Sequence, residues 1–124
     1  MDRQRVQSLV PMAHVADVAA ATAFYETLGF EVCSSFTPPD GTMAVWVSLR
    51  SGSAELMLSR ASAPVVAREQ AVLFYVYCCD VEALHAELAE AGLRPGPIAK
   101  PFYNPKGEFR LVDPDGYVVM VAHL

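Results

Sequence analysis

The sequence is poor in charged residues and contains no long hydrophobic run. Charged residues make up 19% of the 124 residues, and the formal net charge is -5. A nucleic-acid-binding protein needs clustered Lys and Arg to neutralise phosphates, and the few basic residues here form no such stripe. A transmembrane helix needs about 20 consecutive apolar residues, and no run approaches that length. We therefore expect neither a nucleic-acid partner nor a membrane partner.

Cysteine is also scarce, and its pattern indicates neither disulfides nor a metal site. The three cysteines are an odd number. Cys78 and Cys79 are adjacent in a predicted strand, where neighbouring side chains point to opposite faces. Neither CxxC nor a Cys/His metal-ligand spacing occurs. The opening residues, MDRQRVQSL, lack the apolar segment of a signal peptide, so we expect a cytoplasmic protein with reduced thiols.

The strongest local pattern lies in Glu108–Leu124, where two apolar runs flank Asp113-Pro114-Asp115-Gly116. Proline fixes φ, glycine adopts positive φ without strain, and aspartate side chains accept hydrogen bonds from nearby backbone N–H groups. This combination predicts a strand, a tight turn and a second strand.

The sequence predicts the same order of elements twice. The first half has a helix that Asp17 caps and Gly29 ends, and the second half has one between Asp80 and Gly92. The two helices are separated by about half the chain, which indicates an internal repeat. The predicted strands and loops are Gln7–Val15, Glu31–Thr37, the turn Pro38–Gly41, Met43–Leu49, Ala54–Leu58, Val72–Cys78, a Pro-broken strand Leu93–Ile98, and the loop Pro101–Lys106. We predict one domain over residues 1–124, with modules 7–59 and 71–124 joined by a connector over 60–70.

Each module leaves one sheet face without a helix, and we expect the two bare faces to form a shared cup that holds a ligand. Side chains alternate along a strand. Leu56 and Leu58 suit the helix-covered face, so Glu55 and Met57 face the cup. The same alternation places in the cup Val10, Met12, His14, Leu73, Tyr75, Tyr77, Arg110, Val118 and Met120.

Three segments resemble the vicinal oxygen chelate superfamily, which contains glyoxalase I, bleomycin-resistance proteins, fosfomycin-resistance enzymes and extradiol dioxygenases. Val15–Val32 (VADVAAATAFYETLGFEV) is similar to the opening motif of the family, and EFRLVDPDGYVVMV is similar to its closing strand pair. Cys78–Leu93 resembles the second helix of the family. The resemblance implies an α+β fold in which two tandem βαβββ modules form a cupped mixed sheet with helices outside.

The resemblance also implies where enzymatic members bind a divalent metal, with His, Glu or Gln from the first and last strands of each half. The matching positions here are Val10, Glu55, Leu73 and Met120, of which only Glu55 suits such a metal. A two-residue slip would bring His14 to the first position and still leave the site incomplete. We therefore expect no metal and no cofactor, and we favour a non-enzymatic protein of the metal-free, bleomycin-resistance type, which carries a similar E-F-x-[LV]-x-D-P-x-G run.

This family type implies binding and sequestration of an apolar or aromatic, antibiotic-like molecule in the sheet groove, by a homodimer. Aromatic side chains would stack on such a ligand, and methionines would form an adaptable wall. The candidate ligand-binding residues are Met12, His14, Trp46, Glu55, Met57, Tyr75, Tyr77, Phe102, Tyr103, Arg110 and Met120.

Each of these assignments has an alternative. His14 is also explained as a hydrogen-bonded residue at a strand end, Trp46 and the methionines as core residues, and Glu55 as a solvated carboxylate. Arg110 would meet a ligand carboxylate, or pair with Glu55 or Glu108. Two other functions stay open: a metal-dependent lyase, isomerase or dioxygenase with an atypical site at His14 and Glu55, and an interaction domain built on a degenerate fold.

Overall fold

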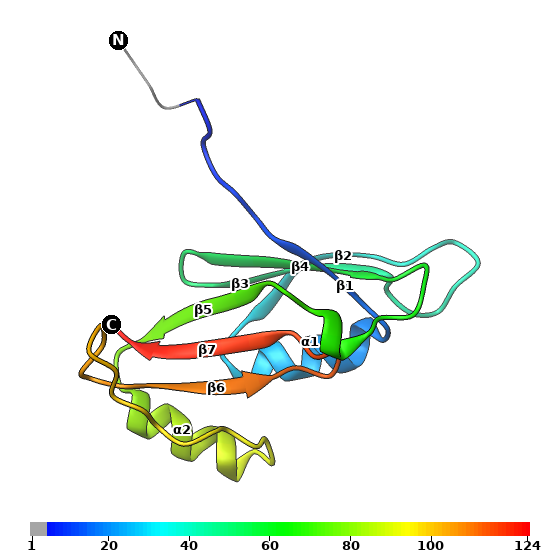
Figure 1. Ribbon diagram of the computed structural model, residues 1–124. Coiled ribbons are helices and arrows are strands. Elements are labelled where there is room, and N and C mark those ends of the chain that lie inside the picture. The colour runs from blue at the N-terminus through cyan, green and yellow to red at the C-terminus, as the bar shows by residue number, and fades with distance from the viewer. Residues whose placement is uncertain (1–4) are drawn as a thin grey trace. The chain divides into compact units, whose positions relative to one another are not determined.

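The computed structural model describes residues 5–124, and the chain divides between Pro64 and Val65 into two compact units (Figure 1). Each unit contains one α-helix and one mixed β-sheet. The chain is therefore an α+β protein with two tandem modules, as the sequence predicted. None of the helices in residues 5–124 is long and apolar enough to cross a membrane.

The first unit is a four-stranded sheet with one helix. Its sheet order is β1-β4-β3-β2, with β1 parallel to β4 and the other pairs antiparallel. The predicted helix cap is confirmed, because the Asp17 side chain accepts a hydrogen bond from the Ala20 backbone N–H at 3.1 Å. Gly29 follows the helix with φ 95°, a conformation that favours glycine. The elements are β1 (Met12–Val15), α1 (Val18–Thr27), β2 (Glu31–Phe36), β3 (Trp46–Ser51) and β4 (Ala54–Arg60).

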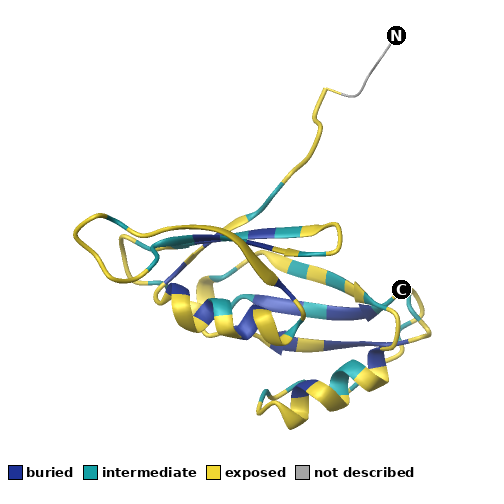
Figure 2. Ribbon diagram, turned by 180° about the vertical axis from the view of Figure 1, so that it is seen from behind, coloured by how far each residue is buried: buried dark blue, intermediate teal, exposed yellow. Residues whose placement is uncertain are grey.

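Helix α1 covers one face of this sheet and contacts β3 and β4. Buried residues recur on one face of the helix, and along β3 and β4 they alternate with intermediate ones, as Figure 2 shows. Tyr25 is the centre of the aromatic packing, with edge-on contacts to Phe24 at 5.0 Å and Phe30 at 6.0 Å. The buried apolar residues of this unit are Ala13, Val15, Val18, Ala21, Phe24, Tyr25, Phe30, Val47, Leu49, Leu56 and Leu58.

The second unit is a three-stranded sheet of order β5-β7-β6, with β5 parallel to β7 and β6 antiparallel to it. Asp80 caps its helix by accepting from the Ala83 N–H at 3.0 Å, and Gly92 follows the helix with φ 90°. Helix α2 contacts β6 and β7, and the His85 ring packs edge-on against Phe109 at 4.9 Å. The elements are η1 (Ala67–Glu69), β5 (Leu73–Cys78), α2 (Val81–Glu90), β6 (Glu108–Val112) and β7 (Val118–His123).

The hairpin predicted near the C-terminus is confirmed. Asp113 closes it, because its backbone N–H donates to the Tyr117 carbonyl at 2.9 Å and its Oδ1 accepts from the N–H groups of Asp115 and Tyr117, each at 2.9 Å. Gly116 has φ 89°, and a Cβ there would lie 2.4 Å from the Cβ of Ala67. This turn fixes the pairing of β6 with β7.

Three of the predicted strands are wrong in whole or part. Met43–Leu49 becomes a strand only at Trp46 and continues to Ser51, because the chain still bends at Met43 and Val45. Gln7–Val15 is a strand only over Met12–Val15, because Pro11 has no N–H to donate, although its carbonyl still accepts from Met57 at 2.9 Å. Leu93–Ile98 is not a strand. Pro95 and Pro97 lack N–H donors, so this segment meets β6 through separate bonds, including Gly96 N–H to the Arg110 carbonyl at 2.8 Å. The second sheet therefore has three strands where the sequence predicted four.

Candidate functional site

The face of the second sheet opposite α2, here called the second open face, carries three rows of side chains. Tyr75 on β5 lies opposite Met120 on β7, and Met120 lies opposite Arg110 on β6. The alternation predicted from the sequence for these three residues is confirmed by this register. The rows are Leu73–Val118–Val112, Tyr75–Met120–Arg110 and Tyr77–Ala122–Glu108.

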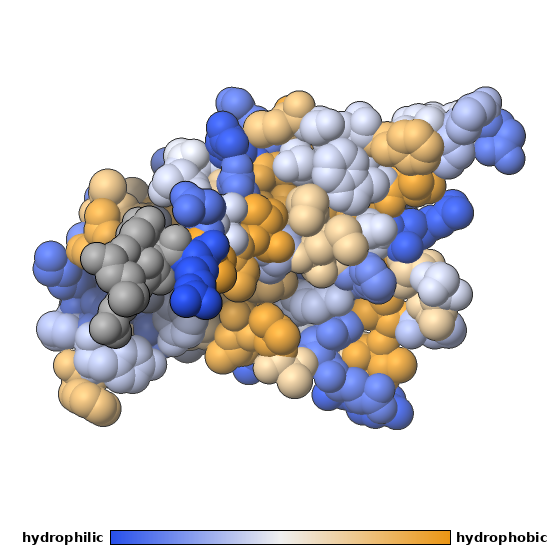
Figure 3. All heavy atoms as spheres, turned by 90° about the horizontal axis from the view of Figure 1, so that it is seen from above, coloured by the Kyte–Doolittle hydropathy of each residue, from blue (hydrophilic) through white to orange (hydrophobic). Residues whose placement is uncertain are grey.

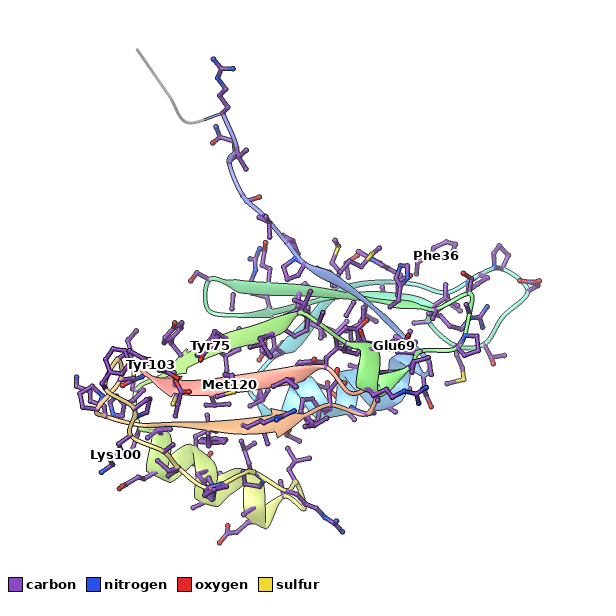
Figure 4. All side chains as sticks on the ribbon, in the orientation of Figure 1. Phe36, Glu69, Tyr75, Lys100, Tyr103 and Met120 are labelled. Carbon is purple, nitrogen blue, oxygen red and sulfur yellow. The ribbon has the colours of Figure 1, made fainter. Side chains whose placement is uncertain are left out.

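Aromatic rings dominate the exposed part of this face. Tyr75 and Tyr77 stack with ring centroids 6.1 Å apart and an interplanar angle of 27°, and they remain 43% and 62% exposed. Tyr103 lies in the loop before β6, with Phe102 edge-on against it at 5.5 Å. Figure 4 shows Tyr75 and Tyr103 close together near Met120. The near-parallel rings of Tyr75 and Tyr77 form a partly exposed aromatic surface, which is the kind of surface on which a planar ligand would stack.

Glu108 is the polar centre of the second open face. Glu108 is the first residue of β6 and is only 5% exposed. Its Oε2 accepts hydrogen bonds from the hydroxyl of Tyr103 at 2.9 Å and from that of Tyr75 at 3.5 Å. The bond to Glu108 raises the pKa of Tyr103 from 10.0 to about 12, with a further contribution from Tyr75. Glu108 therefore links the loop to β5.

The face of the first sheet opposite α1, the first open face, mixes apolar and polar residues. Met12 lies opposite Met57 on β4, and Ser59 lies between His14 and Trp46. Phe36 on β2 lies opposite Trp46 and is exposed. Figure 3 shows exposed hydrophobic residues (orange) among hydrophilic ones (blue) on the side seen from above. The predicted residues on this face are Met12, His14, Trp46, Glu55 and Met57, and strand alternation had assigned all of them except Trp46 to this side.

Glu55 forms an ion pair on this face. Arg50 lies opposite it on β3, and its Nη2 donates to Glu55 Oε1 at 2.5 Å. The hydrogen bond and the charge of Glu55 raise the pKa of Arg50. The sequence reading had offered Arg110 as the partner of Glu55 or Glu108, and in residues 5–124 Arg110 makes no ion pair with either.

The predicted residues therefore fall into two groups, one on each open face, with Phe102 and Tyr103 in the loop before β6. Their role as ligand contacts, and the shared cup, stay predictions. Sequence reasoning missed Glu108 as a site residue because it began the strand at Phe109. The alternation that placed Arg110 on this face also places Glu108 there, two residues earlier, and was the signal that could have found it.

The metal that the family resemblance implies does not fit the donor set. Among residues 5–124, no group of three or more His, Cys, Asp or Glu side chains could hold a metal ion. Glu55 is committed to Arg50, and Met120 lies between Tyr75 and Arg110. The matched positions thus offer one paired carboxylate, which cannot supply the several N or O ligands that a catalytic metal needs.

The first unit also has a pocket of about 270 Å³ at the start of α1. It is open to solvent and contains none of the predicted site residues. Its lining includes Asp17, Val18, Met43, Val45 and Arg60.

In each of the two tandem modules, the first strand pairs in parallel with the last strand. The chain belongs to the Glyoxalase/Bleomycin resistance protein/Dioxygenase superfamily, whose family model matches residues 9–121. The predicted family and fold class are confirmed. A comparison with curated proteins finds no match.

Several solved structures share the fold. A bleomycin-binding protein complexed with bleomycin is 18% identical, with 96% of this chain and 99% of that chain covered and a TM-score of 0.74. The bleomycin-binding protein of Streptomyces verticillus, complexed with copper(II)-bleomycin, is 25% identical, with 97% and 98% covered and a TM-score of 0.69. TnmS3, an antibiotic binding protein from Streptomyces sp. CB03234, is 22% identical, with 96% and 97% covered and a TM-score of 0.72.

Proposed function

We propose that this protein binds an aromatic, antibiotic-like small molecule on the second open face, without a metal, and thereby sequesters it. The observation that carries the proposal is the stacked, exposed pair of Tyr75 and Tyr77 beside Met120. Large exposed aromatic rings on a sheet face lose hydration favourably when a flat ligand covers them.

The chemistry of the face suits shape and stacking more than charge. An aromatic contact adds about 0.5–1.5 kcal/mol beyond the contribution of the area it buries. Contacts to Tyr75 and Tyr77 would therefore supply part of the roughly 8 kcal/mol of binding free energy that corresponds to a micromolar Kd. Met120 supplies a flexible thioether that adapts to irregular ring systems. Arg110, exposed and next to Met120, would meet a carboxylate or a carbonyl at the edge of the ligand.

The structural relatives support the same ligand class. Two of them bind bleomycin and a third is an antibiotic binding protein. The donor set discussed above favours binding over metal-dependent chemistry. A homodimer and a cytoplasmic location stay predictions from the sequence.

The proposal is tested by the melting temperature of the purified protein with bleomycin, with other aromatic antibiotics, and with divalent metals. A ligand at about 100 times its Kd stabilises the folded protein by roughly 2.7 kcal/mol, which raises the Tm by several degrees. We expect a rise with at least one drug and its loss in Tyr77→Ala. The matched control is Val32→Ala, which truncates an exposed side chain on β2 of the first unit.

The opposite results are equally clear. A rise with one divalent metal that is abolished in Glu55→Ala would replace this proposal with the metal-dependent alternative. No rise with any drug at saturating concentration would remove small-molecule sequestration as the function.

A further inference from the structure

One oxygen of the Glu108 carboxylate is left without a partner. Oε1 is buried and has no hydrogen bond to any atom of residues 5–124, whereas Oε2 accepts from Tyr103 and Tyr75. A buried carboxylate oxygen without a donor costs folding free energy, because its hydrogen bonds to water are lost and no protein hydrogen bond replaces them. Such a group in an otherwise satisfied sheet is a candidate for binding rather than for stability.

Both donors to this carboxylate have access to water. Its two donors are hydroxyls of tyrosines that are 43% and 60% exposed, so both hydroxyls would be solvated without it. The backbone bonds between Glu108 and Ala99, at 2.8 and 2.9 Å, are independent of the side chain.

The positive groups near Glu108 do not neutralise it. Arg110 points to the same face two residues along β6, is exposed, and makes no ion pair with Glu108 in the described part of the chain. Lys106 Nζ instead donates to the Leu124 carbonyl at 3.5 Å. Figure 4 shows Lys100 pointing away from Tyr75 and Tyr103. Among residues 5–124, no Lys or Arg side chain forms an ion pair with this carboxylate.

The surroundings specify what kind of cation. Tyr75 donates to Glu108 and also stacks on Tyr77, so the carboxylate lies beside this pair of tyrosine rings. An N–H group attached to a flat ring would reach the carboxylate while the ring covers the tyrosines. Aromatic faces also attract a cation directly.

We infer that Glu108 is the anchor for a cationic nitrogen, such as an amine or amidine, carried by a flat aromatic ligand that stacks on Tyr75 and Tyr77. This inference deepens the proposed function and rests on it. Tyr103 is the closer donor and lies on an exposed loop, so its hydroxyl is the group that moves aside when the ligand nitrogen takes both carboxylate oxygens. In that exchange, a bond in which donor and acceptor are both charged replaces one in which only the carboxylate is charged.

The test compares two probes of the same ring system by fluorescence titration at neutral pH. 9-Aminoacridine is cationic and has N–H donors at its edge, whereas acridine is neutral and has none. We expect the wild-type protein to bind 9-aminoacridine about tenfold more tightly than acridine, since a bond to a charged group is worth roughly one such factor. In Glu108→Gln, which keeps the shape and removes the charge, the ratio of the two Kd values should fall close to one.

Two further variants control the result. Glu87→Gln removes an exposed carboxylate from α2, and the Kd ratio should stay at its wild-type value. Tyr103→Phe keeps the carboxylate but removes its closer donor, so the ratio should be maintained or rise. This second variant tests the anchor even if Glu108→Gln does not fold.

The inference is overturned if Glu108→Gln binds both probes with the wild-type ratio, if Tyr103→Phe abolishes the preference for the cation, or if neither probe binds the wild-type protein. The proposed function is judged separately by the drug panel. A drug that stabilises the wild-type and Glu108→Gln proteins equally would keep the function and remove the anchor.

Discussion

Asp113 organises the turn that joins β6 to β7, and its replacement by alanine should cost about 3 kcal/mol of unfolding free energy. Its Oδ1 accepts from the backbone N–H groups of Asp115 and Tyr117, each at 2.9 Å, in a site where Asp113 is buried. Each hydrogen bond to a charged acceptor is worth about 1.5–3 kcal/mol, and water reaches the freed N–H groups only partly. We take the lower end for each bond, because the turn can relax.

The loss should appear in urea denaturation and as a fall in Tm of roughly 10 °C for a chain of this length. Asp113→Asn keeps one oxygen acceptor without its charge and should cost about 1 kcal/mol. Asp40→Ala, in the exposed turn between β2 and β3, should change stability by less than about 0.5 kcal/mol. A cost below about 1 kcal/mol for Asp113→Ala, or equal costs at Asp113 and Asp40, would refute the reasoning.

Three further predictions follow from individual contacts. Gly116→Ala should lower the Tm far more than Gly52→Ala. Both glycines have positive φ, but a Cβ at position 116 would lie 2.4 Å from Ala67, whereas a Cβ at position 52 would meet no atom within 4 Å. Equal losses of Tm would contradict this. Ultraviolet titration should show one tyrosine that ionises near pH 12 and is absent in Tyr103→Phe. Because folding raises the pKa of Tyr103, the stability from its bond to Glu108 should be complete below pH 10 and be lost as the pH rises through about 12. A double-mutant cycle on Arg50 and Glu55 should give a weak coupling that falls with added salt, because the pair is solvent-exposed. A strong, salt-independent coupling would contradict this.

The features that could be predicted from the sequence were those whose chemistry is local. The Asp17 and Asp80 caps and the turn at Asp113 each depend on residues within four positions, so the sequence pattern contains all of their partners. Strand alternation placed Tyr75 and Met120 on the correct face for the same reason. The family was also evident from these local motifs.

The features that the sequence did not reveal depend on distant partners. Leu93–Ile98 has strand-like residues, yet its prolines leave it with isolated bonds to β6 instead of a ladder. Glu108 gained its importance from Tyr75, 33 residues away on another strand, and from a loop tyrosine whose position no local pattern fixes. Arg50 became the partner of Glu55 only through the register of β3 and β4.

The central claim, that the second open face binds an aromatic drug, is tested most directly by NMR mapping of bleomycin binding to the full chain. We predict that backbone amide shifts concentrate on Tyr75, Tyr77 and Met120, saturate with a single Kd, and vanish in Tyr77→Ala. Shifts concentrated instead around Asp17 and Arg60, at the pocket beside α1, or the same titration in Tyr77→Ala as in the wild-type protein, would contradict the account.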